Sequence, residues 1–163
     1  MTFAEIYGKI RSAVGTLFRR SPAQELTPEE EERAAALWLK KQLEAYVLKS
    51  GGNAYNGKRW QPRKNEKDYN HPILIKSGRL YDAVRKSKIA VIRHKGGRIE
   101  FLAEVDVQRY PKSKSTTRDV FLAHQYGTPK MPARPIFTAL DPKDQAELDE
   151  FVKKMLSGRK QAK

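Results

Sequence analysis

The chain has 163 residues and a mass of 18.7 kDa, which is enough for one domain with a buried core. It holds 33 Lys and Arg against 19 Asp and Glu, a net charge of +14, which indicates a partner such as nucleic acid, an acidic protein surface or further copies of the chain. The lack of Cys excludes a disulfide scaffold and a thiolate metal site, and no apolar run is long enough to predict a membrane span.

The first predicted element is an amphipathic helix over residues 3–18. Its apolar side chains recur at three- and four-residue steps, and Thr2 with Glu5 fits a capping box. The RRSPAQ stretch that follows reads as a linker, so this helix packs either on its own core or on a neighbouring subunit. We expect the subunit contact, and the candidate interface residues on this helix are Phe3, Ile6 and Ile10.

A second helix is predicted from Thr27-Pro28 to about Lys49. The proline at the first helical position and the acids of the first turn favour a helix start, and Gly51-Gly52 stops it. Its expected inward side chains are Ala35, Trp38, Leu39, Leu43, Tyr46 and Val47.

Residues 53–72 resemble a loop, in which Trp60 is expected to anchor the chain to the core. Ser77 is the expected N-cap of a short helix that turns Leu80, Tyr81 and Val84 inward.

The clearest β signal is a hairpin formed by residues 88–93 and 98–107 around Gly96-Gly97. In its second strand two sets of residues alternate, which predicts one buried and one solvated face. The buried set is Ile99, Phe101, Ala103, Val105 and Val107, and the solvated set is Glu100, Leu102, Glu104 and Asp106.

A basic loop over residues 108–118 follows the hairpin. Its cations face DNA phosphates, face an acidic partner, or form an ordinary solvated surface, and the sequence leaves these alternatives open. The four cations are Arg109, Lys112, Lys114 and Arg118.

The remaining elements are two helices and a strand. Asp119 is expected to cap a short helix that Gly127 ends, an edge strand is expected at Ile136-Phe137, and Asp141-Pro142 opens a last helix that stops at Gly158.

These elements predict an α+β fold, an antiparallel β-sheet with helices packed on one side and an N-terminal helical arm. The arm of two helices would occupy residues 1–50, and residues 51–163 would form the α+β core with the basic loop and the C-terminal helix.

Enzyme chemistry has little support in the sequence, so no catalytic residue, cofactor or metal is expected. His71, His94 and His124 have no zinc-site spacing; the first two are expected at the surface and the third as a buried hydrogen-bonding residue. Nucleophile-elbow, Walker and dinucleotide-binding motifs are absent. The acids Glu100, Glu104 and Asp106 are expected to form salt bridges with nearby Lys rather than to bind a metal cation.

Four short motifs in a fixed order resemble the phage virion morphogenesis family, also called tail completion proteins, and related head–tail joining proteins. They are GKRWQP, ILIKSGRL, HQYG and PARPIF, between residues 57 and 137. The motif residues that the resemblance singles out are Trp60, Leu74, Gly78, Leu80, His124, Gly127, Pro135 and Phe137.

This resemblance implies a structural virion protein that is not an enzyme. It implies a homo-oligomeric ring, a hexamer, at the neck of the virion, assembled in the host cytoplasm. The implied partners are the tail tube protein and head-completion or connector proteins, with transient contact to double-stranded DNA and none with a membrane. Arg134, held between two prolines, forms an ion pair across a subunit boundary or pairs within its own chain. The alternative function is a basic nucleic-acid-binding protein without catalytic activity.

Overall fold

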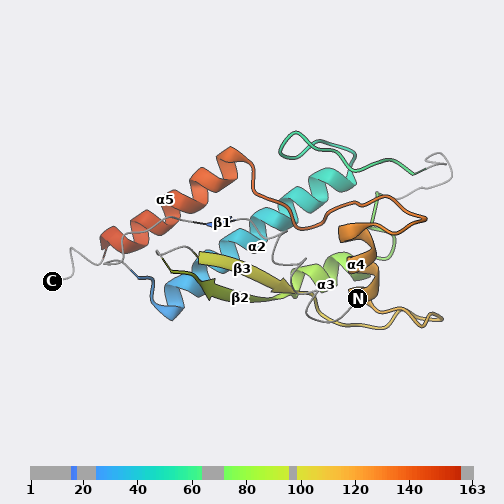
Figure 1. Ribbon diagram of the computed structural model, residues 1–163, viewed down its shortest axis with the longest axis horizontal. Helices are drawn as coiled ribbons and strands as arrows, with labels where there is room; N and C mark the ends of the chain where they lie inside the picture. Colours follow the sequence, from blue (N-terminus) through green and yellow to red (C-terminus); the bar gives the residue numbers. More distant parts are fainter. Residues whose placement is uncertain (1–15, 18–24, 64–71, 96–98, 159–163) are drawn as a thin grey trace. The chain divides into compact units, whose positions relative to one another are not determined.

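The computed structural model describes residues 16–17, 25–63, 72–95 and 99–158 (Figure 1). The elements in chain order are β1 (Thr16–Leu17), α2 (Pro28–Ser50), α3 (Arg79–Arg85), β2 (Lys88–Arg93), β3 (Ile99–Glu104), α4 (Thr117–Tyr126) and α5 (Pro142–Gly158). The predicted α+β class and the predicted β-hairpin are therefore confirmed.

The chain divides into two compact units. The first unit comprises Met1–Lys41, Ile89–Ala103 and Ala139–Lys163, and the second comprises Gln42–Lys88 and Glu104–Thr138. The expected separation of residues 1–50 from residues 51–163 stays a prediction.

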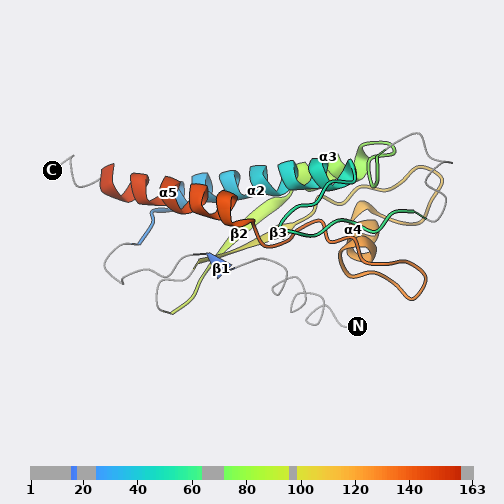
Figure 2. The same cartoon turned by 90° about the horizontal axis from the view of Figure 1, so that it is seen from above.

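In the first unit, α5 and the first part of α2 cover one face of a sheet with strand order β1-β3-β2 (Figure 2). Trp38 of α2 packs on Phe101 of β3 with 5.7 Å between ring centroids. Lys41 joins α2 to α5 through Glu147 at 2.7 Å and Asp144 at 3.2 Å. These contacts place the core of this unit between the helices and β3.

Strand β1 corrects the end of the predicted N-terminal helix. Thr16 pairs with Glu100 and Leu17 with Ile99 in antiparallel register, so these two residues are extended rather than helical. The candidate interface residues Phe3, Ile6 and Ile10 lie outside the described residues.

The start of α2 is as predicted, and its buried face is predicted in part, since Ala35, Trp38 and Tyr46 are buried as expected. The Thr27 hydroxyl accepts from the Glu30 amide at 3.3 Å, and the Glu30 carboxylate accepts from the Thr27 amide at 2.9 Å. Val47, predicted to point inward, is 51% exposed, whereas Gln42 and Lys49 are almost fully buried. The apolar pattern was misleading because these two polar side chains bind backbone groups from a distant part of the chain.

The hairpin also departs from simple alternation. Glu100 is buried and lies 2.6 Å from the His94 ring, so it pairs with a histidine rather than a lysine. Val107, predicted to be buried, is 54% exposed because β3 ends at Glu104, before this residue. The predicted edge strand at Ile136-Phe137 is wrong, since these residues form no strand.

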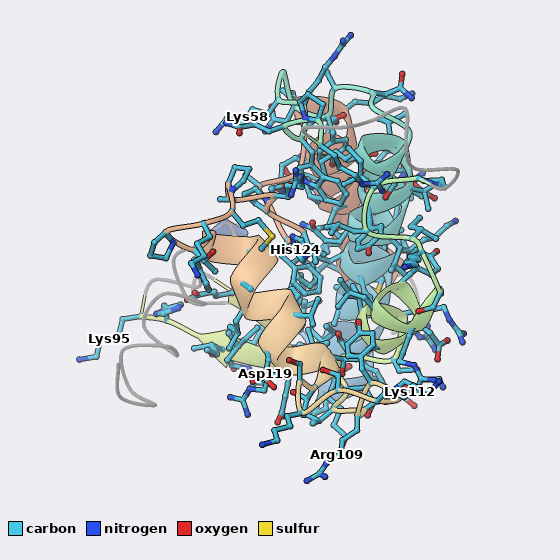
Figure 3. The ribbon with its side chains drawn as sticks, turned by 90° about the vertical axis from the view of Figure 1, so that its right-hand side faces the viewer. Lys58, Lys95, Arg109, Lys112, Asp119 and His124 are labelled. Carbon is cyan, nitrogen blue, oxygen red and sulfur yellow. The ribbon has the colours of Figure 1, made fainter. Side chains whose placement is uncertain are left out.

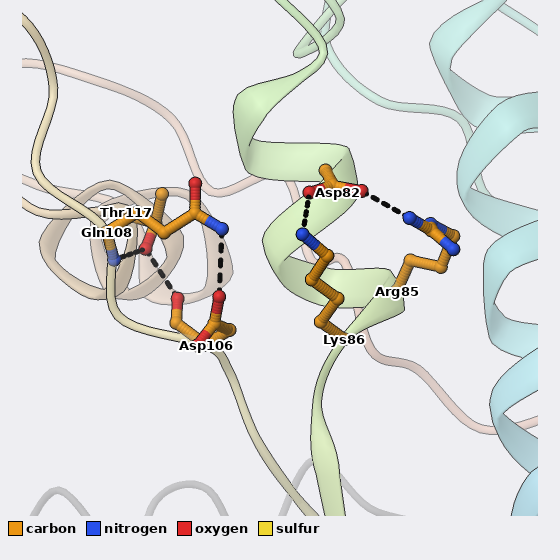
Figure 4. Close-up of polar contacts among 6 residues, drawn as sticks. All are labelled: Asp82, Arg85, Lys86, Asp106, Gln108 and Thr117. Carbon is orange, nitrogen blue, oxygen red and sulfur yellow. Dashed lines mark hydrogen bonds and ion pairs between the residues drawn. The ribbon is translucent and has the colours of Figure 1, made fainter.

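In the second unit, α3 packs against α4. The N-cap of α3 is Gly78 rather than Ser77, and that of α4 is Thr116 rather than Asp119, which instead completes the capping box. The Thr117 hydroxyl accepts from the Gln108 amide and donates to the Asp106 carbonyl at 2.6 Å (Figure 4). These bonds fix both ends of the basic loop.

The last helix, α5, matches its prediction at both ends. The Asp141 carboxylate accepts from the Asp144 amide at 2.8 Å, and the helix extends to Gly158. Leu148 and Val152 of its predicted apolar stripe are buried, which fixes the helix in the core of the first unit.

Candidate functional site

All of the motif residues lie in the second unit, where residues 60–62 meet residues 133–137. The Trp60 indole donates to the Pro135 carbonyl at 2.9 Å. In the opposite direction, Arg134 donates to the carbonyls of Gln61 at 2.8 Å and Pro62 at 3.3 Å. Trp60 is buried as predicted, and the two proline-containing segments are held together by these side chains.

Arg134 is buried, and its hydrogen bonds to Gln61 and Pro62 stay within its own chain. Of the two alternatives for this residue, these contacts favour the intrachain one, with carbonyl groups in place of an acid as partners. Its backbone amide also donates to the His124 carbonyl at 2.7 Å, which attaches the end of α4.

Gln125 holds the backbone that was expected to form a strand. Its amide nitrogen donates to the Phe137 carbonyl at 2.8 Å, and its amide oxygen accepts from the amides of Ile136 and Phe137 at 2.8 and 3.0 Å. Gln42 does the same for Thr138, whose carbonyl and amide it binds at 2.6 and 3.2 Å. Two glutamine side chains therefore replace a partner strand for residues 136–138.

Lys49 occupies the centre of this cluster and was not found from the sequence. Only 2% exposed, it donates to the carbonyls of Pro135 at 2.8 Å and Ile136 at 3.1 Å. Its ammonium also lies 5.1 Å from the centre of the Trp60 ring. Carbonyls and an aromatic face stabilise a buried cation, yet burial lowers the pKa of Lys49 to about 8.

We expect the stability of the protein to increase between about pH 8 and pH 10.5 because of Lys49. The unfolded chain retains this proton up to the ordinary pKa of 10.5, whereas the folded chain loses it near pH 8. Stability therefore increases with pH in this interval, by at most about 3 kcal/mol. Urea unfolding at pH 7.5 and pH 10 should show the increase in the original chain and not in Lys49→Met. Equal pH dependence in both proteins would contradict it.

The basic loop forms a small hairpin-like turn in the second unit. Arg109 and Thr116 form a bridge, and the Tyr110 amide donates to the Ser115 carbonyl at 3.2 Å. The side chains of Arg109, Lys112 and Lys114 are exposed, whereas Arg118 is half-buried. Figure 3 shows Arg109 and Lys112 pointing outward beside the first turn of α4. Three of the four predicted cations therefore share one exposed loop.

A pocket of about 590 Å³ opens between this loop, residues 73–80 and α4. The motif residues Leu74, Gly78 and His124 line it, as does Arg134. Leu74 and Gly78 both have positive φ angles, 61° and 71°, which sharply bend the segment that forms one wall.

His124 is half-buried on α4 at the edge of the pocket. Burial, and secondarily the charge of Arg134, lowers its pKa to about 4, so it is neutral at pH 7. Its Nδ1 atom is buried and has no hydrogen-bond partner among the described residues. The sequence predicted a buried hydrogen-bonding histidine; the structure gives the burial in part, and Nδ1 has no hydrogen-bond partner among the described residues.

No group of three or more His, Asp or Glu side chains in the described ranges is arranged to hold a metal ion. Similarly, no helix in the described part of the chain is long and apolar enough to cross a membrane. Comparison of the sequence and the structure with family models, curated proteins and solved structures found no match.

Proposed function

We propose that this chain is a structural virion protein of a tailed phage, which forms a homo-oligomeric ring at the head–tail junction through which DNA passes. The observation that supports the proposal is that separate motifs are joined in the second unit by hydrogen bonds from side chains of one motif to backbone carbonyls of another. Trp60 binds Pro135, Arg134 binds Gln61 and Pro62, and the Arg134 amide binds the His124 carbonyl, so three motif segments form one cluster. The resemblance depends on these motifs.

The chemistry of this cluster favours a structural role over catalysis. Lys49, Gln125 and Arg134 are all buried, and the hydrogen bonds given above direct them at backbone groups of their own chain. A general acid or base must instead reach a substrate atom. In the proposed ring, this cluster provides a rigid frame for the surfaces that contact other subunits.

The exposed cations of the basic loop have a role in the same proposal. Arg109, Lys112 and Lys114 would face either the DNA path or an acidic ring of partner subunits. The alternative function, a nucleic-acid-binding protein without catalytic activity, depends on the same exposed loop. The two functions differ in the oligomer that they require and in the affinity of the isolated protein for DNA.

We expect the purified full chain to form a closed ring. Sedimentation velocity at several protein concentrations should give one mass that is a fixed multiple of 18.7 kDa, and negative-stain images should show rotational symmetry. A chain that is monomeric at all concentrations and salt conditions would overturn the ring proposal.

Binding to a duplex oligonucleotide at 50 and 200 mM salt then separates the two functions. Micromolar or tighter binding by a monomer, falling steeply with salt, would favour the alternative. The double variant Lys112→Glu/Lys114→Glu should remove that binding. Lys143→Glu/Lys153→Glu, which changes two exposed lysines of α5, is the charge-matched control.

A further inference from the structure

The charged side chains among the described residues that line the pocket of the second unit are all positive. Arg63, Lys76 and Arg134 contribute three cations to it, and none of the described residues that line it is acidic. Lys76 is exposed, whereas Arg134 is buried. Arg134 also donates to the carbonyls of Gln61 and Pro62, and Arg63 donates to that of Pro72. The arrangement favours an anionic ligand, because an anion entering here meets cations and no opposing carboxylate from the described wall.

Polar groups without charge add to this wall. The hydroxyls of Ser77, Ser113 and Tyr110 line the pocket, together with the ring of His124. The buried Nδ1 atom of His124 has no hydrogen-bond partner among the described residues, and such a buried atom costs stability when it is left unpaired. Because this atom has essentially no accessible surface, a ligand in the pocket would contact the exposed part of the ring instead.

The remaining wall is apolar. Ile73, Leu74, Leu80 and Val120 line the pocket, and Ile73 and Leu80 are themselves buried. A small inorganic anion would contact the cations and leave this apolar surface in contact with water. The pocket of about 590 Å³ instead has the size and mixed lining of a site for a ligand with both an anionic and an apolar part.

We propose that this pocket binds a short acidic peptide segment of a partner protein, with one carboxylate at the cationic wall and a neighbouring aliphatic side chain on the apolar wall. The inference deepens the proposed function, on which it depends, because it gives the chemistry of the partner at the junction.

Two other occupants fit the observations less well. A second copy of this chain would have to present an extended acidic segment, but its acids Glu29, Glu30 and Glu31 lie in the first turn of α2. A DNA duplex presents its phosphates on a convex surface, which fits the exposed tip of the basic loop better than the interior of a pocket. Charge and shape together therefore favour an acidic peptide.

The test uses the full chain and two synthetic hexapeptide pools. In the first pool, Glu or Asp alternates with Leu, Ile, Val or Phe; in the second, Gln and Asn replace the acids. Calorimetric titration should detect binding of the acidic pool, and the amide pool should bind at least tenfold more weakly. The absence of binding by the acidic pool, or equal binding of both pools, would overturn the inference.

Two pairs of variants locate the binding. Lys76→Glu reverses an exposed charge of the pocket lining and should weaken the binding of the acidic pool about tenfold. Lys58→Glu, at an exposed site outside the lining, should change the affinity for that pool less than about twofold. Ser115→Trp fills the pocket from the exposed loop and should abolish binding, whereas Ser157→Trp on α5 should not. Equal effects within either pair would overturn the location.

Three further measurements complete the test. Unchanged melting temperatures show that the variants are folded. Lys114 lies on the basic loop outside the pocket lining. If a duplex oligonucleotide still displaced the acidic pool from the Lys114→Glu variant, the pocket would be assigned to DNA and the inference contradicted. Sedimentation of the original chain tests the ring separately. If the chain forms a ring but does not bind the acidic pool, only this inference is contradicted. If the chain is monomeric and binds the acidic pool, only the ring proposal is contradicted.

Discussion

Gly127→Ala should destabilise the protein by about 3–4 kcal/mol. Gly127 has a φ of +75°, and a Cβ atom there would lie 2.8 Å from the Ala133 nitrogen and 3.1 Å from the Met131 carbonyl oxygen. Real Cβ atoms do not approach backbone so closely, so residues 131–133 would have to move. These residues lead directly into Arg134, and the displacement would therefore disturb its bonds to Gln61 and Pro62.

Gly52→Ala is the matched control. Gly52 also has a positive φ, +81°, but no atom lies within 4 Å of its added Cβ. It should lose only the backbone preference of glycine, about 1 kcal/mol. Urea unfolding of both variants measures the difference. Similar losses of unfolding free energy in the two variants would contradict the effect of the close approach of residues 131–133. The positive φ angle would then be the sole cause of the destabilisation.

Local signals in the sequence were sufficient for the hairpin and for the helices α2, α3, α4 and α5. Thr27-Pro28 and Asp141-Pro142 begin helices because each cap is formed within four residues, so no distant part of the chain is needed to define it. Gly127 similarly ends α4 as predicted. The assigned caps Ser77 and Asp119 were wrong by one and three positions, because Gly78 and Thr116 compete for the same role.

The buried face of α2 was not predictable in the same way. Periodicity identifies apolar residues, and the centre of this face is occupied by Gln42 and Lys49. Their partners at residues 135–138 lie more than 85 positions later in the chain. A polar side chain with a distant backbone partner has the same local pattern as a solvated one, so only the folded chain reveals that it is buried.

In the candidate site, too, some features were predictable from the local sequence and others depend on distant contacts. The motif residues gather in the second unit, but the pocket beside them is formed by the basic loop, residues 73–80 and α4, together with Arg63 and Arg134. Arg63 lies just outside the motifs and Lys76 lies within ILIKSGRL, but no local pattern indicates that these two residues share a wall. Of the cations selected from the sequence for partner contact, Arg134 alone lines the pocket among the described residues, while Arg109, Lys112 and Lys114 lie on the exposed loop.

Gln125→Leu should cost about 4 kcal/mol of folding free energy, since it leaves three buried backbone groups of Ile136 and Phe137 without the partner that binds them. Gln125→Glu keeps an accepting oxygen but buries a carboxylate against the Phe137 carbonyl, so its cost should be at least as large. Gln145→Leu on α5 removes one partly exposed side-chain bond and should cost less than about 1 kcal/mol.

Amide hydrogen exchange separates loss of this clamp from general destabilisation. In Gln125→Leu, the amides of Ile136 and Phe137 should exchange at least a hundredfold faster under conditions in which the buried amides of β3 remain protected. The clamp predicts this local effect because two of its three bonds are made by those amides. Retained protection at both positions would mean that the prolines and the Phe121–Phe137 ring contact, at 5.5 Å, hold this backbone without Gln125.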